Sequence, residues 1–254
     1  MSLAEGWQTA LRIVERIRAA GLTAAVNQQM RWEPGVRSCR HLLSERVLGT
    51  AYDIAFHVYV DTPWHLWGWI SEKETIEVLY HSIHYLDSIR YLMVLEPHRL
   101  YCSSSRRPGY AAQGETRTCT HLTFAGDLRA TVLCNHHVEW GRFSQQSEFR
   151  IDATNGMVVR QLGLLLNYPK GAPDALRYIM RADGQWRQAT FEETWFPDAF
   201  VGPMTSLMRV LNGQIAKPET DVEDNLQTLH LVFAAYESMR TGDAVGLMGP
   251  TWQT

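Results

Sequence analysis

Residues 76–92 read IEVLYHSIHYLDSIRYL, and this stretch organises our interpretation of the whole chain. Apolar side chains recur in it every three or four residues, a spacing that continues just beyond it: Ile76, Leu79, Ile83, Leu86 and Met93. That spacing predicts a helix with one face packed into a hydrophobic core. We therefore expect this helix to lie at the centre of the fold.

Three chemically active side chains run beside the apolar stripe. Glu77, His81 and His84 stand at i, i+4 and i+7, so on an α-helix a carboxylate and two imidazoles share a neighbouring face. Imidazole suits proton transfer near neutral pH because its unperturbed pKa lies there. A histidine on a helix is more often structural or solvated than catalytic, so the pattern alone leaves both roles open.

The composition is that of a globular chain with enough apolar residues for a sizeable core. It has 254 residues, of which 45% are hydrophobic, enough for one large domain or two small ones. With 24 basic and 27 acidic residues and no dense basic block, we expect no nucleic-acid and no membrane partner. The four cysteines are widely spaced without a C-x-x-C, which indicates reduced thiols in a cytoplasmic protein.

Elements before and after the central helix follow from periodicity and turn residues. Upstream we predict a helix over 4–20, a buried strand over 22–27, a helix over 34–47, a strand over 50–61 and an aromatic loop over 62–70. Downstream we predict strands over 98–104, 117–124, 128–138, 147–153, 157–162, 176–180 and 188–192. Two closing helices are predicted over 198–213 and 221–242, the second capped by Asp221 and ended by Gly242.

Consecutive strands without intervening helices indicate a mostly antiparallel sheet. Helices flank this run of strands, so the predicted fold class is α+β: a large mostly antiparallel sheet with helices packed on one face. The open face then needs a cover. We expect a second copy of the chain to provide it, in a homodimer or tetramer that uses the open face for oligomerisation.

Several local strings add a family resemblance to this pattern. They are AVNQQMRWEP at 25–34 with the helix that follows, the helical segment 82–87, the long β region, and DVEDNL at 221–226 with AYES at 235–238. Together they resemble the C-terminal portion of the Gfo/Idh/MocA family of NAD(P)-dependent oxidoreductases. The resemblance covers nearly the whole chain, and it implies a domain that binds a small-molecule substrate.

Two hallmarks of that family are missing from the sequence. Its members join a Rossmann domain, opened by the fingerprint G-x-G-x-x-G, to the α+β domain. Here no two glycines stand at i, i+2, and the Glu-Lys-Pro motif expected just before residue 4 is absent. We therefore expect a truncated chain, with 4–27 as the last helix and crossover strand of a Rossmann domain and 28–254 as the substrate and dimerisation domain. NAD or NADP is expected to bind the full-length protein, while this chain alone is expected to bind none and to be inactive.

The resemblance also implies which residues form the site. The family pattern Asp-x-x-x-His on the central helix removes a hydroxyl proton as hydride leaves the same carbon. His84 matches the histidine and becomes the candidate catalytic base, while Tyr80 occupies the aspartate position with His81 beside it as a possible relay. The implied substrate is a sugar-like or polyol hydroxyl.

Four further substrate-binding candidates come from neighbouring segments. Asn27 and Arg31 lie where the predicted strand ends, a common place for ligand contacts. Trp64 and Trp67 come from the aromatic loop, which suits the wall of a pocket. The leading interpretation involves no metal.

Two other functions fit the same residues. A metal-dependent hydrolase or lyase would use Glu77, His81 and His84 as ligands, although zinc needs three or four converging ligands. A non-catalytic assembly module would use the helix face for packing only. The spacing alone does not separate these alternatives.

Overall fold

A nine-stranded sheet forms the centre of the protein in the computed structural model, which describes residues 2–110 and 112–247. Its strands are β1 (Ala51–Tyr59), β2 (Arg99–Ser105), β3 (Arg117–Thr123), β4 (Arg129–Asn135), β5 (Gln146–Ala153), β6 (Gly156–Gln161), β7 (Ala175–Met180), β8 (Trp186–Ala189) and β9 (Val245–Gly246). They lie side by side in the order β8-β7-β6-β5-β1-β4-β3-β2-β9. β1 runs parallel to β4, while the other neighbouring strands pair antiparallel.

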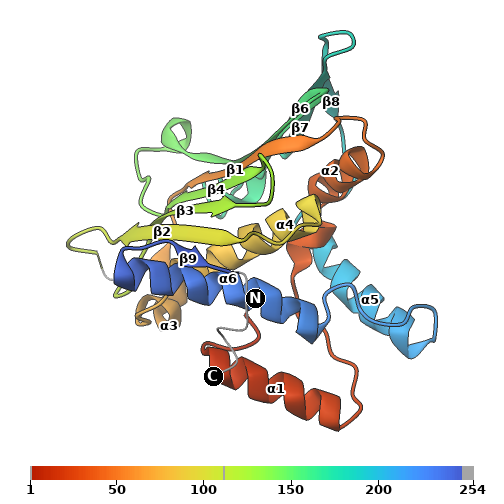
Figure 1. The fold of residues 1–254 in the computed structure, drawn as a ribbon. Helices are drawn as coiled ribbons and strands as arrows, with labels where there is room; N and C mark the ends of the chain where they lie inside the picture. The colour runs from red at the N-terminus through yellow and green to blue at the C-terminus, as the bar shows by residue number, and fades with distance from the viewer. Residues whose placement is uncertain (1, 111, 248–254) are drawn as a thin grey trace.

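Helices form the second layer. The α-helices are α1 (Trp7–Ala19), α2 (Pro34–Ser44), α3 (Gly68–Ser71), α4 (Ile83–Met93), α5 (Val201–Leu211) and α6 (Val222–Thr241). Helices α2, α4 and α6 cover one face of the sheet, and α1 lies on the far side of α6 (Figure 1). The predicted α+β class, with a mostly antiparallel sheet and helices on one face, is confirmed.

Short helical turns join these elements. The 3-10 turns are η1 (Gln29–Trp32), η2 (Trp64–Trp67), η4 (Arg142–Ser144), η5 (Gly163–Leu165) and η6 (Asp198–Phe200). One turn, η3 (Val78–Ser82), is a π-helix that runs directly into α4. Residues 62–70, predicted as an irregular loop, instead contain η2 and α3.

Helix ends follow the capping residues of the sequence. The Glu33 carboxylate accepts hydrogen bonds from the backbone N–H groups of Gly35 and Val36, and Pro34 occupies the first turn of α2. Asp221 caps α6 in the same way, and Gly242 ends it in the left-handed region at φ 79°. Both ends of α6 agree with the prediction.

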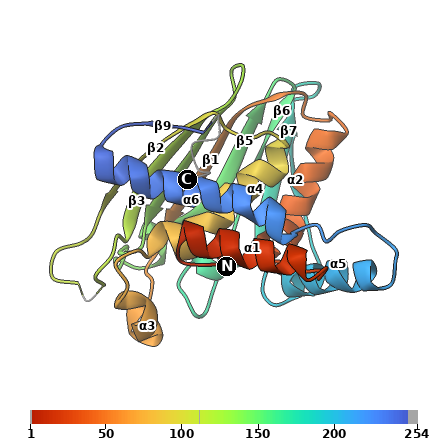
Figure 2. The ribbon, with the colours of Figure 1, turned by 60° about the horizontal axis from the view of Figure 1, so that its bottom comes forward.

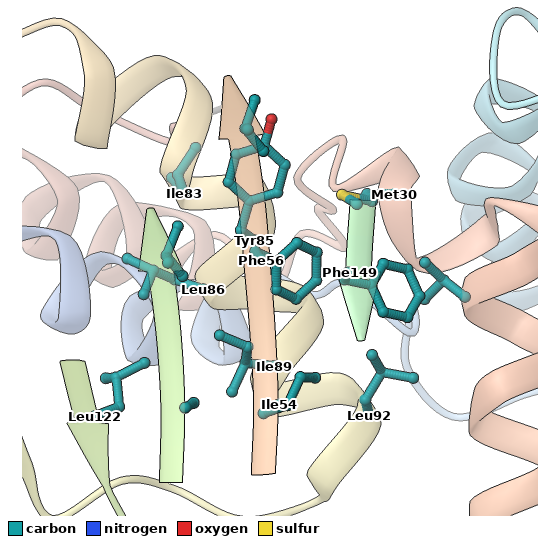
Figure 3. Close-up of a cluster of buried hydrophobic side chains, with 14 of the residues drawn as sticks. Met30, Ile54, Phe56, Ile83, Tyr85, Leu86, Ile89, Leu92, Leu122 and Phe149 are labelled. Carbon is teal, nitrogen blue, oxygen red and sulfur yellow. The ribbon is translucent and has the colours of Figure 1, made fainter. Parts of the chain in front are cut away.

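The hydrophobic core lies between the sheet and α4. Ile54 and Phe56 of β1 face Ile83, Leu86 and Ile89 of α4, and all five side chains are fully buried (Figure 3). The Phe56 ring lies 5.3 Å from that of Tyr85 and 4.9 Å from that of Phe149, measured between ring centroids. The apolar stripe predicted for the central helix is thus its core face.

A buried ion pair joins α2 to the other half of the sheet. Arg160 of β6 has no exposed side-chain area, and its guanidinium contacts the equally buried Glu33 carboxylate. Asp174 lies 3.0 Å from the same guanidinium. Because a buried charge is tolerated only when it is paired, these contacts fix the position of α2 over β6.

The strand predicted over 22–27 is wrong. The segment is extended, but it pairs through a single bridge between Ala25 and Asp221, and the Val26 N–H donates to the Thr220 carbonyl at 2.8 Å. Val26 packs with Val14 of α1 and Val222 of α6. Val26 is therefore buried against helices instead of a sheet, while Leu22 is 65% exposed.

The N-terminal segment and the helical layer pack together. Figure 2 shows α1 running alongside α6, and the Trp7 ring lies 6.1 Å from that of Phe233. The domain division at residues 27 and 28 stays a prediction, and residues 248–254 of the predicted domain lie outside the described residues. Within the part of the chain that the structure describes, no helix is long and apolar enough to cross a bilayer.

The open face of the sheet carries the side chains that alternate with the core residues. Tyr101 on β2, between the buried Leu100 and Cys102, is 39% exposed on this face. Neighbouring positions such as His57 and Leu133 are half-buried by the strands beside them. The face thus presents a mixed aromatic and polar surface.

Candidate functional site

The π-helical turn η3 sets the geometry of the site. In a π-helix the hydrogen bonds run from i to i+5, so residues five apart share a face. The Ser82 hydroxyl accordingly donates to the Glu77 carboxylate at 2.7 Å. The α-helical spacing expected for Glu77 and His81 is wrong here, because the predicted single helix is a π-turn followed by α4.

His81 lies in an aromatic environment at the end of this turn. Its ring centroid is 4.6 Å from that of His136 and 5.8 Å from that of Trp64, which approaches edge-on. Burial lowers the pKa of His81 to about 3, with His136 adding to the shift and Glu77 opposing it. His81 is therefore neutral at physiological pH.

His84 follows at the start of α4 and is half-buried. Burial, reinforced by His81, lowers the pKa of His84 well below its usual range. A neutral imidazole of this kind is an acceptor for a proton from a bound hydroxyl group. The structure thus supplies the protonation state that a general base needs.

Tyr80 and Trp67 contact other segments of the chain. The Tyr80 hydroxyl donates to the Glu5 carboxylate at 2.6 Å, and burial together with Glu5 raises the pKa of Tyr80. The ring of Trp67 lies 5.6 Å from that of Tyr168, in the connection between β6 and β7. Tyr80 therefore ties the π-turn to the N-terminal segment.

Arg31 lies in a buried ion-pair network. Its guanidinium donates two hydrogen bonds of 2.7 Å to Asp87 and contacts Asp224 of α6. Burial lowers the pKa of Arg31, but Asp87 and Asp224 outweigh it, so the pKa is raised overall. These contacts hold η1, α4 and α6 together, which favours a structural role over the predicted contact with substrate. Asn27 is half-buried just before η1.

A carboxylate, a thiol and an imidazole meet behind the π-turn. Glu77, Cys134 at the end of β4 and His136 just beyond it each offer one ligand atom within 4.8 Å of the others. Burial raises the pKa of Glu77, but His136, Thr118 and Ser82 outweigh it and lower the pKa to about 2. Glu77 is thus an ionised carboxylate with no exposed side-chain area.

This cluster differs from the metal-ligand set considered from the sequence. Among the described residues, the group of converging ligand atoms contains Glu77 but neither His81 nor His84. The sequence interpretation did not include Cys134 and His136, which lie more than fifty positions from Glu77. The one visible signal was the pair His136-His137 near the end of the strand predicted over 128–138.

The chain is similar to a known protein family. Residues 36–159, which include β1, the π-turn and β4, match the family model of the GFO/IDH/MocA C-terminal domain. Over these residues the chain is similar to the GFO/IDH/MocA C-terminal domain. The resemblance predicted from the sequence is thereby confirmed.

A curated protein to which this chain is similar is D-apiose dehydrogenase from Paraburkholderia graminis. The two are 26% identical over 251 residues, covering 92% of this chain and 62% of the relative. The chain therefore spans less than two thirds of the relative's length.

Solved structures share the fold across nearly the whole chain. An oxidoreductase from Agrobacterium radiobacter, solved with NAD+, L-tartaric acid and magnesium, has a TM-score of 0.78 at 19% identity, covering 96% of this chain and 70% of that one. The aldose-aldose oxidoreductase from Caulobacter crescentus, solved with glycerol, has a TM-score of 0.78 at 17% identity and the same coverage. An inositol dehydrogenase homolog from Azotobacter vinelandii, solved with NADH and myo-inositol, has a TM-score of 0.74 at 13% identity, covering 96% and 69%.

Proposed function

We propose that this chain is the substrate-binding and oligomerisation portion of an NAD(P)-dependent oxidoreductase that acts on a sugar-like or polyol hydroxyl. The observation that carries the proposal is the match to the GFO/IDH/MocA C-terminal domain, because the matched residues include the two neutral histidines of the central helix. The related D-apiose dehydrogenase and the inositol dehydrogenase homolog support a polyhydroxylated substrate.

The dinucleotide does not fit this chain by itself. The sequence has no G-x-G-x-x-G, and its sheet is mostly antiparallel, whereas that fingerprint works at the start of a parallel βαβ unit. We therefore assign NAD or NADP to a separate nucleotide-binding domain that acts together with this one. Because this sequence contains no dinucleotide fingerprint, we predict that the chain alone turns over no substrate.

Within the site, His84 takes the proton of the substrate hydroxyl, since its imidazole is neutral at physiological pH. His81 stands one turn before it as a relay, and Trp64 packs edge-on against His81 as a wall. Tyr80 and Trp67 hold the surrounding segments and line the approach. Asn27 is a further candidate for substrate contact, and Arg31 contributes through the position of η1, which it ties to Asp87.

The decisive experiment uses the longest reading frame that contains this chain. Its protein is assayed with NAD+ and NADP+ against a panel of aldoses and polyols, and we expect reduction of one dinucleotide. His84→Gln is expected to lower kcat by about 10²–10⁴-fold, as loss of a general base does. His41→Gln, on the exposed side of α2, is the matched control. Unchanged turnover in His84→Gln would favour the assembly-module alternative.

A second measurement concerns the chain alone. Titration with NADH and NADPH, followed by nicotinamide fluorescence, is expected to give no saturable binding in the micromolar range. Micromolar affinity would remove the assignment of the cofactor to another domain.

For assembly we propose that the open face pairs with the same face of a second copy, in a homodimer or tetramer. The half-buried Leu133 and exposed Tyr101 supply the apolar contacts that such an interface needs. Light scattering after size exclusion is expected to show an oligomer that Leu133→Arg dissociates.

We also propose a cytoplasmic location. The free thiols of Cys39, Cys102 and Cys134 are buried, which supports it, because reduced cysteines are typical of that compartment.

A further inference from the structure

The cluster of Glu77, Cys134 and His136 has the composition of a metal centre. The three residues come from the turn before η3, the end of β4 and the loop after it, and they are 0%, 4% and 2% exposed. One ligand atom of each lies within 4.8 Å of the others. A carboxylate oxygen, a thiolate and an imidazole nitrogen are the three donor types that zinc uses in proteins.

The orientation of His136 points to a ligand. Its Nδ1 lies 2.7 Å from the Thr62 hydroxyl, so that nitrogen is already hydrogen-bonded. Its Nε2 lies 3.7 Å from the Glu77 carboxylate, and within the described ranges this buried nitrogen has no hydrogen-bond partner. When Nδ1 carries the imidazole proton, the Nε2 lone pair faces a negative oxygen, so the space between them favours a cation.

The spacing agrees with zinc. Two ligand atoms that each lie about 2.0–2.2 Å from a tetrahedral zinc are about 3.3–3.6 Å apart. The 3.7 Å between His136 Nε2 and Glu77 Oε1 is close to that separation. Hydroxyl groups hold the ligands from outside, with Ser82 and Thr118 donating to the Glu77 carboxylate at 2.7 and 2.5 Å. Metal ligands are typically oriented by outer hydrogen bonds of this kind.

We propose that Glu77, Cys134 and His136 bind a Zn²⁺ ion that fastens the π-turn to the end of β4. On binding, the Cys134 thiol loses its proton to solvent and forms the Zn–S bond, while Glu77 and His136 each donate an electron pair. One zinc, one carboxylate and one thiolate then give a centre without net charge, which suits a buried position. The centre also fixes the His136 ring, against which His81 lies at 4.6 Å between centroids.

Cobalt provides the direct test. The chain is freed of metal with a chelator and titrated with Co²⁺, and we expect one equivalent to produce the near-ultraviolet absorption of a thiolate bound to Co²⁺. Zn²⁺ is expected to abolish the absorption by displacement. Cys134→Ser is expected to lose it, while the control Cys119→Ser, which removes the exposed thiol of β3, keeps it. Wild type without the absorption, or a Cys119→Ser variant that loses it, would overturn the proposal.

A second pair of variants covers the case in which Cys134→Ser does not fold. His136→Gln is expected to weaken Zn²⁺ binding by at least about 100-fold, because a direct ligand contributes more than an outer hydrogen-bond partner, whose loss costs about 10–100-fold. His137→Gln removes the adjacent imidazole, whose Nε2 bonds to Thr116, and is expected to bind as tightly as wild type. Calorimetry in two buffers should also record one proton released per zinc. Equal affinity in both variants, or no proton release, would mean that the cluster is a metal-free ion pair.

Discussion

Replacing Arg31 by methionine tests whether the buried network under α4 supports the fold. Arg31 is 5% exposed and Asp87 is 1% exposed, and two 2.7 Å hydrogen bonds join them. Methionine fills the space of the side chain but offers no donor. Asp87 would keep the Thr228 hydroxyl at 2.8 Å and Arg90 at 3.9 Å.

The expected loss follows from these remaining contacts. Removing one partner of a buried ion pair costs about 3–5 kcal/mol because the other charge stays buried. Since Asp87 keeps a hydroxyl and a more distant guanidinium, we expect the lower end, about 3 kcal/mol. For a domain of this size that loss lowers Tm by about 6–12 °C.

Urea denaturation followed by tryptophan fluorescence measures the loss. Arg18→Met is the matched control, because the Arg18–Glu223 pair is 67% and 56% exposed and such surface pairs contribute at most about 1 kcal/mol. The double variant Arg31→Met/Asp87→Leu is expected to regain stability, since no buried charge is left alone. A loss below about 1 kcal/mol in the single variant would refute the structural role of Arg31.

Three further predictions concern packing and pH. Gly202→Ala should cost about 1–3 kcal/mol, because its Cβ would stand 2.0 Å from the Trp32 ring, whereas Gly68→Ala meets nothing within 4 Å; thermal denaturation compares them. Phe56→Ala should cost about 3–5 kcal/mol in urea denaturation, since the ring is fully buried. Burial raises the pKa of Asp224, but Arg31 and Arg90 outweigh it and lower the pKa overall. The free energy of unfolding should therefore fall as the pH drops below 3.8, the ordinary pKa of an aspartate. Circular dichroism should show a smaller fall in an Asp224→Asn variant.

Periodicity and turn residues were sufficient to predict most of the fold. The strand over 50–61 and the paired strands over 147–153 and 157–162 depend on local side chains, and the structure has β1, β5 and β6 at these places. The apolar run at 22–27 shows the limit of this approach. A short buried segment has the same composition whether a strand or two helices cover it, and here α1 and α6 do so.

The candidate site was less accessible from the sequence than the fold. The π-turn leaves no trace in the apolar spacing, because Leu79 and Ile83 are buried in either helix type. Cys134 and His136 reach Glu77 only through the parallel pairing of β4 with β1 and the packing of α4 beneath both strands. Such contacts depend on the register of the whole sheet, which local patterns do not contain.

The π-turn changes the direction in which side chains point along one continuous helix, because it inserts one extra residue before α4. One residue of an α-helix corresponds to a rotation of about 100°, so the extra residue in η3 turns everything before it relative to α4. Deleting Tyr80 would restore regular α-helical winding and leave Glu77 four residues before Ser82, a spacing at which the two side chains still share a face. The extra residue therefore keeps Glu77 and Ser82 together while it lets Tyr80 reach Glu5 of the N-terminal segment.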